Sequence, residues 1–150
     1  MIASIFQKLF HKDLNRNGEE VSIIANRVFS DRILYDIVLN STGGIVGYCD
    51  LRKIHDENHY YFGNVGYRIY QPYRGHNYAY KACLLLFKAA KEQGMDYLII
   101  TCSPDNLASK RICEKLPGYF IEQVDVPPWH QLYRQGEKVK NIYRYDLQEK

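Results

Sequence analysis

The residue types that point most directly to chemistry lie in the segment YRGHNYAYKA, residues 73–82. Gly75 lets the backbone approach a ligand closely, and Asn77 tolerates the left-handed φ that glycine would normally supply in a tight turn. Arg74 and His76 add side-chain donors. Because the first N–H groups of a following helix lack partners and carry a partial positive charge, this pattern predicts a phosphate-binding site. A basic, solvated loop with an incidental glycine is the alternative.

The elements around this segment would hold it at the start of a helix. Residues 60–70, YYFGNVGYRIY, alternate apolar and polar side chains as a strand does, and Pro72 ends that strand because proline cannot donate to a ladder. From Ala79 onward apolar side chains recur at helical spacing, and Gly94 is typical of a helix end. The sequence therefore predicts a strand, the basic loop and a long helix in that order.

The rest of the chain supplies the elements of a mixed α/β domain. A second helix is expected after Ser103, a capping residue type, with Pro104 in its first turn, and it should end at residues 117–118. A short amphipathic helix is expected at residues 2–10, and further strands at residues 32–40, 45–54, 95–102, 119–126 and 138–147. The order β-β-β-α-β-α-β-β predicts a mostly antiparallel sheet with one βαβ crossover.

Length and composition are those of one globular domain spanning residues 1–150. The net charge of +3 is too small to indicate nucleic acid, and no RNA-binding motif surrounds the 14 tyrosines, so a nucleic-acid partner is not expected. The four cysteines show no paired short spacing, so no metal site is predicted. Residues 1–13 are too short and too polar for a membrane span and lack a cleavage site, which favours a cytoplasmic protein without membrane contact.

Two blocks of the sequence resemble the GNAT superfamily of acetyl-CoA-dependent N-acetyltransferases. Residues 63–84, GNVGYRIYQPYRGHNYAYKACL, are similar to its central motif, in which Gln or Arg is followed by two residues, Gly, one residue, and Gly or Ala. Arg74 is the first element, Asn77 replaces the middle glycine, and Ala79 is the last. Residues 98–120, LIITCSPDNLASKRICEKLPGYF, are similar to its strand–Asn–helix segment. The resemblance covers residues 40–147 and is closest to an uncharacterised group of predicted acetyltransferases.

The resemblance implies where coenzyme A would bind. The pyrophosphate would lie on the backbone N–H groups of residues 75–79, and the pantetheine arm would lie between two splayed strands, pairing with the backbone near Ile69 and Tyr70. Asn106 would bond the arm from the other side with Ser109 close by, although helix capping is the alternative for both. Lys115 and Lys110 or Arg111 would lie near the 3′-phosphate, or on a solvated helix face. The implied cofactor-binding residues are Ile69, Tyr70, Arg74, Gly75, His76, Asn77, Tyr78, Ala79, Asn106 and Ser109.

The positions that carry acid and base residues in many superfamily members hold other types here. Gly63 and Asn64 stand where a glutamate base is common, Thr101 at a second such position, and Cys113 where a tyrosine often serves as the acid. Asn64 could position a water and Cys113 could protonate a thiolate; a structural polar group and an inert buried thiol are the alternatives. A backbone N–H near Ile69 could form an oxyanion hole. These residues favour direct transfer in a ternary complex, without a covalent enzyme intermediate.

The other titratable side chains are expected to be exposed in loops or packed in the sheet, without a role in catalysis. His55, His59 and His130 lie in or beside predicted loops, where exposure is expected. The strand residues Tyr67, Tyr143 and Tyr145 are expected to contribute to sheet packing.

The leading functional hypothesis is transfer of the acetyl group of acetyl-CoA to a primary amine of a small molecule or peptide. A non-catalytic acyl-CoA-binding module, acting as a regulator or sensor, is the alternative that the missing acid and base residues favour. A third hypothesis is an interaction domain that uses its tyrosine-rich surface. The N-terminal region is short for the superfamily, which implies an open acceptor site or its completion by a second subunit in a homodimer.

Overall fold

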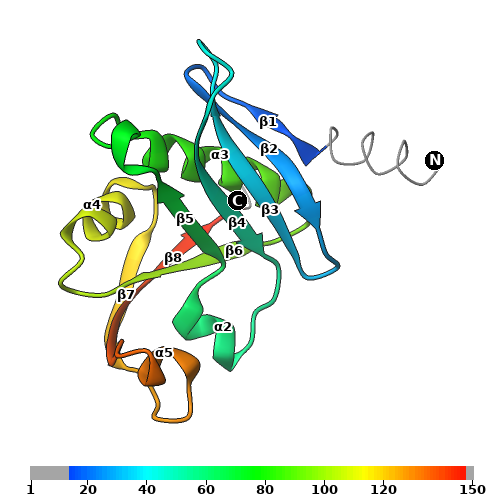
Figure 1. Ribbon diagram of the computed structural model, residues 1–150. Coiled ribbons are helices and arrows are strands. Elements are labelled where there is room, and N and C mark those ends of the chain that lie inside the picture. Colours follow the sequence, from blue (N-terminus) through cyan, green and yellow to red (C-terminus); the bar gives the residue numbers. More distant parts are fainter. Residues whose placement is uncertain (1–13, 148–150) are drawn as a thin grey trace.

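The first of two sheets is antiparallel throughout. The structure, a computed structural model, describes residues 14–147, so the helix predicted at residues 2–10 lies outside the described residues. The strands have the order β1-β2-β3-β4-β5 (Figure 1) and comprise β1 (Arg16–Asn17), β2 (Val21–Val28), β3 (Arg32–Leu39), β4 (Ile45–Arg52) and β5 (Val65–Ile69).

The second sheet follows later in the chain and is also antiparallel. Its order is β6-β8-β7, formed by β6 (Tyr97–Cys102), β7 (Tyr119–Asp125) and β8 (Val139–Asp146). Helix α4 (Leu107–Lys115) connects β6 to β7, and the short α5 (Gln131–Arg134) lies between β7 and β8. Between residues 14 and 147, no helix has the length and hydropathy needed to cross a bilayer.

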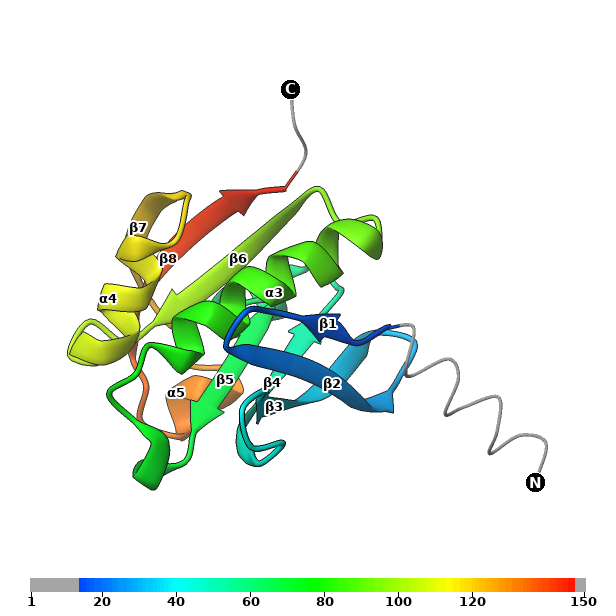
Figure 2. The same ribbon diagram turned by 90° about the horizontal axis from the view of Figure 1, so that it is seen from above.

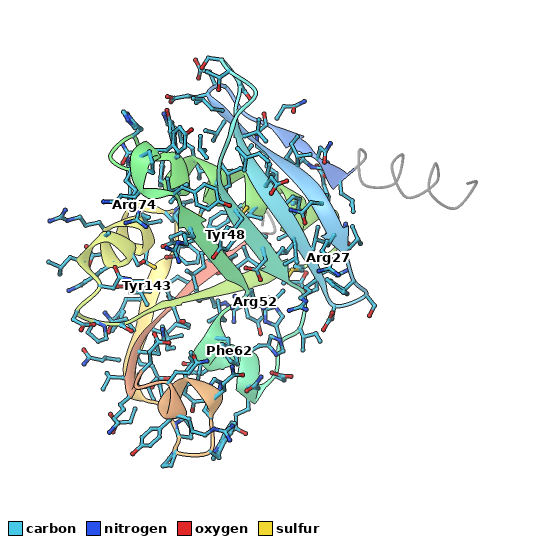
Figure 3. All side chains as sticks on the ribbon, in the orientation of Figure 1. Arg27, Tyr48, Arg52, Phe62, Arg74 and Tyr143 are labelled. Carbon is cyan, nitrogen blue, oxygen red and sulfur yellow. The ribbon has the colours of Figure 1, made fainter. Side chains whose placement is uncertain are left out.

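Helix α3 (Tyr78–Glu92) is the crossover that joins β5 to β6, and it covers one face of the first sheet (Figure 2). Its inner side chains are fully buried, including Ala82, Cys83 and Leu86. The opposite face of β2, β3 and β4 carries none of the described helices, and the labelled Tyr48 and Arg52 belong to it (Figure 3). We call this the outer face. The predicted mixed α/β fold, mostly antiparallel with one crossover, is confirmed.

The segment before β5 differs from the sequence prediction. Residues 60–70 were expected to form one strand, but α2 occupies Glu57–Phe62 and β5 begins only at Val65. Asp56 caps α2 by accepting a hydrogen bond from the His59 N–H at 2.7 Å, and Gly63 ends the helix at φ +80°. The two tyrosines and the phenylalanine of this segment favour a strand by propensity, but the local cap and the terminal glycine override that preference.

Two further boundaries also differ. β2 is absent from the sequence prediction because its apolar alternation is interrupted near Asn26 and Arg27, where the structure has an irregular register with β3. Helix α4 begins at Leu107 and not after Ser103, because the side chain of Asn106 accepts a hydrogen bond from a backbone N–H of the first turn and serves as the cap.

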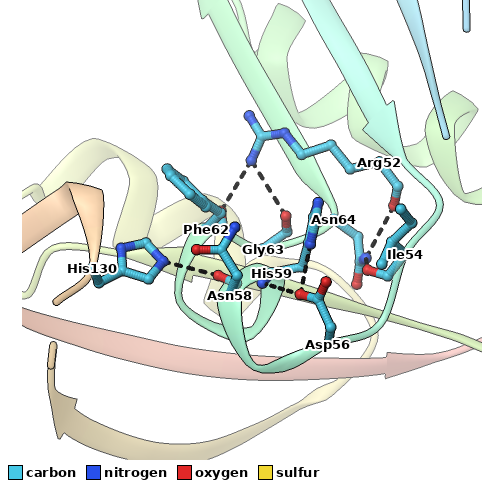
Figure 4. A network of polar contacts seen from close by, with 9 residues as sticks. All are labelled: Arg52, Ile54, Asp56, Asn58, His59, Phe62, Gly63, Asn64 and His130. Carbon is cyan, nitrogen blue, oxygen red and sulfur yellow. Dashed lines mark hydrogen bonds and ion pairs between the residues drawn. The ribbon is translucent and has the colours of Figure 1, made fainter.

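β5 and β6 meet at Asn64, the residue that directly precedes β5. The Asn64 N–H donates to the Ile99 carbonyl at 2.6 Å, and the Asn64 Oδ1 accepts from the Ile99 N–H at 2.8 Å. The Nδ2 group donates to the carbonyls of Arg52 and Ile54, both at 3.0 Å (Figure 4). One fully buried side chain therefore joins β6 to the end of β4.

Beyond Asn64 the two strands separate. β5 and β6 belong to different sheets and share no ladder, so the edge of each strand is open above the contact. Gly63 permits the close approach below it, because a Cβ atom there would lie 3.1 Å from the Ile99 carbonyl oxygen. We call this opening the strand gap. It is the separation of the two strands that the resemblance to the GNAT superfamily implied.

We predict that Asn64→Ala lowers the free energy of unfolding by about 3 kcal/mol, because it leaves the buried Ile99 N–H and two carbonyls without partners. Urea denaturation measures the change. Asn26→Ala is the control: this exposed amide makes one hydrogen bond, to Asp36 at 3.0 Å, and its loss should cost less than about 0.5 kcal/mol. Equal losses in the two variants would contradict the role given to Asn64.

Candidate functional site

A cavity of about 490 Å³ lies between β5, the start of α3 and the side of α4. It opens beside the strand gap, because residues of β5 form part of its wall. The lining side chains and backbone come from Tyr67, Arg68, Ile69, Tyr73, Arg74, Gly75, Asn77, Tyr78, Ala79, Tyr80, Ala108, Ser109, Arg111, Ile112 and Lys115.

The loop that enters α3 has the conformation that the sequence predicted. Asn77 has φ 62° and ψ 23°, the left-handed region, and Gly75 has φ +93° with no atom near the position of a Cβ. The Asn77 side chain makes no capping hydrogen bond, so the first N–H groups of α3, at Tyr78 and Ala79, are not satisfied by the cap. These donors face a cavity that can hold an anion.

Cationic side chains surround the same cavity. Arg74, Arg111 and Lys115 all line it, and the Lys115 ammonium lies 4.2 Å from the centre of the Tyr80 ring. Two of these cations come from α4, on the opposite side of the cavity from the α3 amides. The arrangement places positive charge on both sides of a cavity large enough for a nucleotide-like ligand.

Arg74 also fixes the loop to the strand. Its Nε donates to the Ile69 carbonyl at 2.9 Å, across the turn formed by the 3-10 helix η1 (Gln71–Tyr73). His76 does not line the cavity; its ring stacks on that of Tyr78 at 5.2 Å between centroids. Of the two side-chain donors singled out in the loop, only Arg74 therefore faces the cavity.

The hydrogen-bond register decides which groups of β5 face the gap. The Arg52 N–H donates to Asn64 at 2.7 Å and the Tyr70 N–H donates to Val46 at 2.9 Å, so alternate residues from 64 to 70 bond β4. The backbone groups of Tyr67 and Ile69 point the other way, into the gap. The expectation for Tyr70 is corrected, because its carbonyl is also occupied, by the Tyr73 N–H at 2.9 Å.

The edge of β6 follows the same alternation. The Leu147 N–H donates to Asp96 at 2.8 Å, so the even residues of β6 bond β8 and the odd residues face β5. Ile99 uses that direction to bond Asn64, and the backbone of Thr101 then faces the gap. The Thr101 side chain is occupied elsewhere, since its hydroxyl donates to the Tyr61 carbonyl at 2.9 Å.

Tyr67 is a site residue that the sequence reasoning assigned to packing. Its side chain lines the cavity together with Ser109 of α4. Burial raises the pKa of the Tyr67 hydroxyl well above its usual value, so the group stays protonated at neutral pH. Side chains alternate between the two faces of a strand, so Tyr67 lies on the same face as Val65 and Ile69. This alternation could have identified Tyr67 as a cavity residue from the sequence.

The residues expected on α4 separate into two roles. Ser109 lines the cavity, whereas Asn106 is exposed and caps the helix, its Oδ1 accepting from the Ser109 N–H at 3.2 Å. The capping role weighed from the sequence is therefore observed for Asn106, and Ser109 lies at the cavity. Contact of either with coenzyme A stays a prediction.

The two residues expected to act in catalysis are both deeply buried. Asn64 uses both amide hydrogens and its carbonyl oxygen on the chain's own backbone, which leaves no donor for a water. Cys113 is 2% exposed and does not line the cavity. A hydrogen bond with Cys102 and burial raise the pKa of the Cys113 thiol, so it holds its proton firmly. The environments of both residues are those of structural groups.

His130 is buried, contrary to the exposure expected from its loop position. Its Nδ1 accepts from the Leu132 N–H at 3.0 Å, so Nε2 carries the proton and donates to the Asn58 carbonyl at 2.9 Å (Figure 4). This histidine caps α5 and fastens it to α2. Among residues 14–147, no three His, Cys, Asp or Glu side chains are placed to hold a metal ion.

Comparison with known proteins places the chain among acetyltransferases. The family model described as an acetyltransferase (GNAT) domain matches residues 7–117. The acetyltransferase (GNAT family) from Bacillus anthracis is 24% identical, with a TM-score of 0.62 over 77% of this chain and 67% of that one. The chain has no match among curated proteins.

Two solved structures with bound ligands share the fold. RimL, a ribosomal L7/L12 alpha-N-protein acetyltransferase in complex with coenzyme A, is 17% identical, with a TM-score of 0.60 over 78% of this chain and 63% of that one. MccE, the microcin C7 self-immunity acetyltransferase in complex with acetyl-CoA and AMP, is 15% identical, with a TM-score of 0.59 over 97% and 69%.

We predict that Asn77→Val weakens coenzyme A binding about tenfold or more, because a β-branched residue at φ 62° costs at least about 1–2 kcal/mol and turns the α3 amides away from the cavity. Asn77→Gly is the matched control and should bind as the wild type does, since glycine adopts this φ without strain. Isothermal titration calorimetry gives both Kd values. A Val variant that binds coenzyme A like the wild type would rule out this loop as the phosphate site.

Proposed function

The chain belongs to the acetyltransferase (GNAT) family, which transfers the acetyl group of acetyl-CoA, and we propose that its acceptor is a primary amine of a small molecule or peptide. The amine attacks the thioester directly within a ternary complex. The observation that supports this proposal most is the cavity at the uncapped start of α3, which opens beside the unpaired edge of β5.

The residues of the cavity fit coenzyme A. The backbone N–H groups of residues 75–79 would hold the diphosphate, and the cations of α4, Arg111 and Lys115, would meet further phosphate charge. The pantetheine arm carries amides that pair with a strand edge, and the gap-facing Tyr67 carbonyl and Ile69 N–H offer that pairing. The Ile69 carbonyl already accepts from Arg74, so the arm would pair mainly with the other groups of this edge.

The reaction joins nitrogen to the acetyl carbon and breaks the carbon–sulfur bond; the ammonium form of the acceptor gives one proton to solvent before the attack and a second to the departing sulfur. An alkylamine has a pKa near 10.4 in water, so it must lose a proton before it attacks. The gap-facing Tyr67 N–H, which lies farther from the phosphate loop than the Ile69 N–H, would stabilise the negative charge on the carbonyl oxygen. The protonated Tyr67 hydroxyl, in place of the buried Cys113, would donate a hydrogen bond to the departing sulfur.

A non-catalytic acyl-CoA-binding module is the second candidate. The observation that favours it is the complete occupation of the Asn64 side chain by backbone groups, at the position where relatives often carry a glutamate. A module of this kind would keep the cavity and its phosphate loop and would show no turnover.

Incubation with acetyl-CoA and a panel of amines distinguishes these candidates. The panel comprises cadaverine, spermidine, tyramine and an alanine tripeptide with a free N-terminus, with release of thiol and the mass of the product as readouts. We expect acetylation of at least one amine, with kcat/KM rising as pH rises toward the pKa of the amine. Coenzyme A binding without turnover on any amine would favour the non-catalytic module.

We predict that Tyr67→Phe lowers kcat about tenfold, because it removes the hydrogen bond to the leaving sulfur, while the Kd for coenzyme A stays unchanged. Tyr80→Phe is the control: Tyr80 lines the same cavity but packs under Lys115, so its hydroxyl should not affect kcat. Steady-state kinetics with the best acceptor of the panel give both values. An unchanged kcat in the Tyr67 variant would remove this residue from the reaction.

A further inference from the structure

The outer face of the first sheet carries a largely buried carboxylate directly across from β5. Asp50 of β4 lies opposite Gly66 of β5, and its side chain is 15% exposed. Arg52 orients both oxygens, with its Nε 2.8 Å from Oδ2 and its Nη2 3.4 Å from Oδ1. A carboxylate offers more acceptor positions than one arginine occupies, so Asp50 retains hydrogen-bonding capacity toward a ligand.

Arg52 is itself held by the chain that leads into the strand gap. Its Nη1 donates to the carbonyls of Phe62 at 3.1 Å and Gly63 at 3.3 Å (Figure 4). These carbonyls directly precede Asn64, where β5 and β6 meet. The Asp50–Arg52 pair therefore has a fixed position relative to the gap and is not a mobile surface ion pair.

Gly66 provides the room for this pair. A Cβ atom at residue 66 would lie 2.4 Å from the Asp50 Oδ1 and 2.6 Å from the Arg52 Nη2, so any side chain would displace them. The carboxylate consequently lies against the bare backbone of β5. The next residue, Tyr67, faces the gap with its backbone, so Asp50 lies across the strand from the coenzyme A cavity.

Two aromatic rings extend the outer face beside the carboxylate. Tyr48 is two residues before Asp50 on the same face and is 45% exposed, and Tyr70 is 40% exposed. Their ring centroids are 6.2 Å apart with the planes tilted by 58°. Tyr48 is next to Asp50 on this face and Tyr70 lies farther along β5, so an amine whose charge meets the carboxylate could lay an apolar or aromatic portion along the two rings.

We propose that Asp50 binds the ammonium group of the acceptor on the outer face and directs it through the strand gap toward the thioester, with Tyr48 and Tyr70 contacting the rest of the molecule. The inference rests on the proposed acetyl transfer and adds the acceptor class: a primary amine that arrives as a cation attached to an apolar or aromatic portion. The acceptor gives its proton to water before the attack, because the neutral nitrogen is the nucleophile.

Asp50→Asn tests the assignment, since it keeps the shape of the side chain and one oxygen for Arg52 but removes the charge. With the best acceptor of the panel, we expect KM for the amine to rise about tenfold or more. The Kd for acetyl-CoA and the slow hydrolysis of acetyl-CoA without amine should stay unchanged. Tyr48→Ala, which alters an exposed side chain, gives a second variant in which the amine KM should also rise.

Asp36→Asn is the matched control. Asp36 lies on the same face but on β3, one strand farther from the gap, and accepts a hydrogen bond from Asn26. Its loss should leave the amine KM unchanged.

The outcomes separate the two proposals. A wild type that acetylates an amine, with an unchanged KM in Asp50→Asn, overturns the role of Asp50 and leaves the proposed function standing. A parallel loss of acetyl-CoA affinity in Asp50→Asn also overturns it, because the residue would then be structural. A wild type that binds acetyl-CoA and acetylates none of the amines overturns both.

Discussion

The contact between Asn64 and Ile99 is the constraint on which the rest of the site depends. A strand that follows another through a helical crossover would normally pair with it along its whole length. Here the pairing of β5 with β6 is limited to Asn64. Its side-chain Oδ1 accepts the hydrogen bond from the Ile99 N–H, which a backbone carbonyl of the neighbouring strand would accept in a continuous ladder. Both side-chain amide hydrogens donate to carbonyls at the end of β4, those of Arg52 and Ile54, so the two sheets are joined at one point and diverge from it.

The divergence turns ordinary strand edges into a binding surface. Above Asn64 the backbone groups of Tyr67 and Ile69 have no strand partner, and the uncapped start of α3 lies at the far end of the same cavity. On the opposite face, Gly66 leaves the strand bare beneath Asp50 and Arg52. One strand thus separates the cavity proposed to bind coenzyme A from a carboxylate-bearing face, which is the geometry that two substrates meeting at a single carbon require.

Local features of this structure were predictable from the sequence, and long-range ones were not. The left-handed conformation of Asn77 and the start of α3 followed from residue types alone. The division of residues 60–70 did not, because the strand propensity of the aromatic residues outweighed the signal of the Asp56 cap. The direction of the Tyr70 N–H depends on the register of β5 with β4. The burial of His130 depends on its contact with α2. Both contacts join segments that are distant in the sequence, so a short segment does not encode them.

The bond between Arg74 and the Ile69 carbonyl bears on the kinetics of cofactor capture. Because the chain ties its own loop to the strand, the conformational entropy of ordering that loop is lost during folding and not at each encounter with the ligand. The amides proposed to bind the diphosphate are therefore already ordered before the ligand arrives. Association should then be governed by diffusion and electrostatic attraction, without a slow step of loop closure.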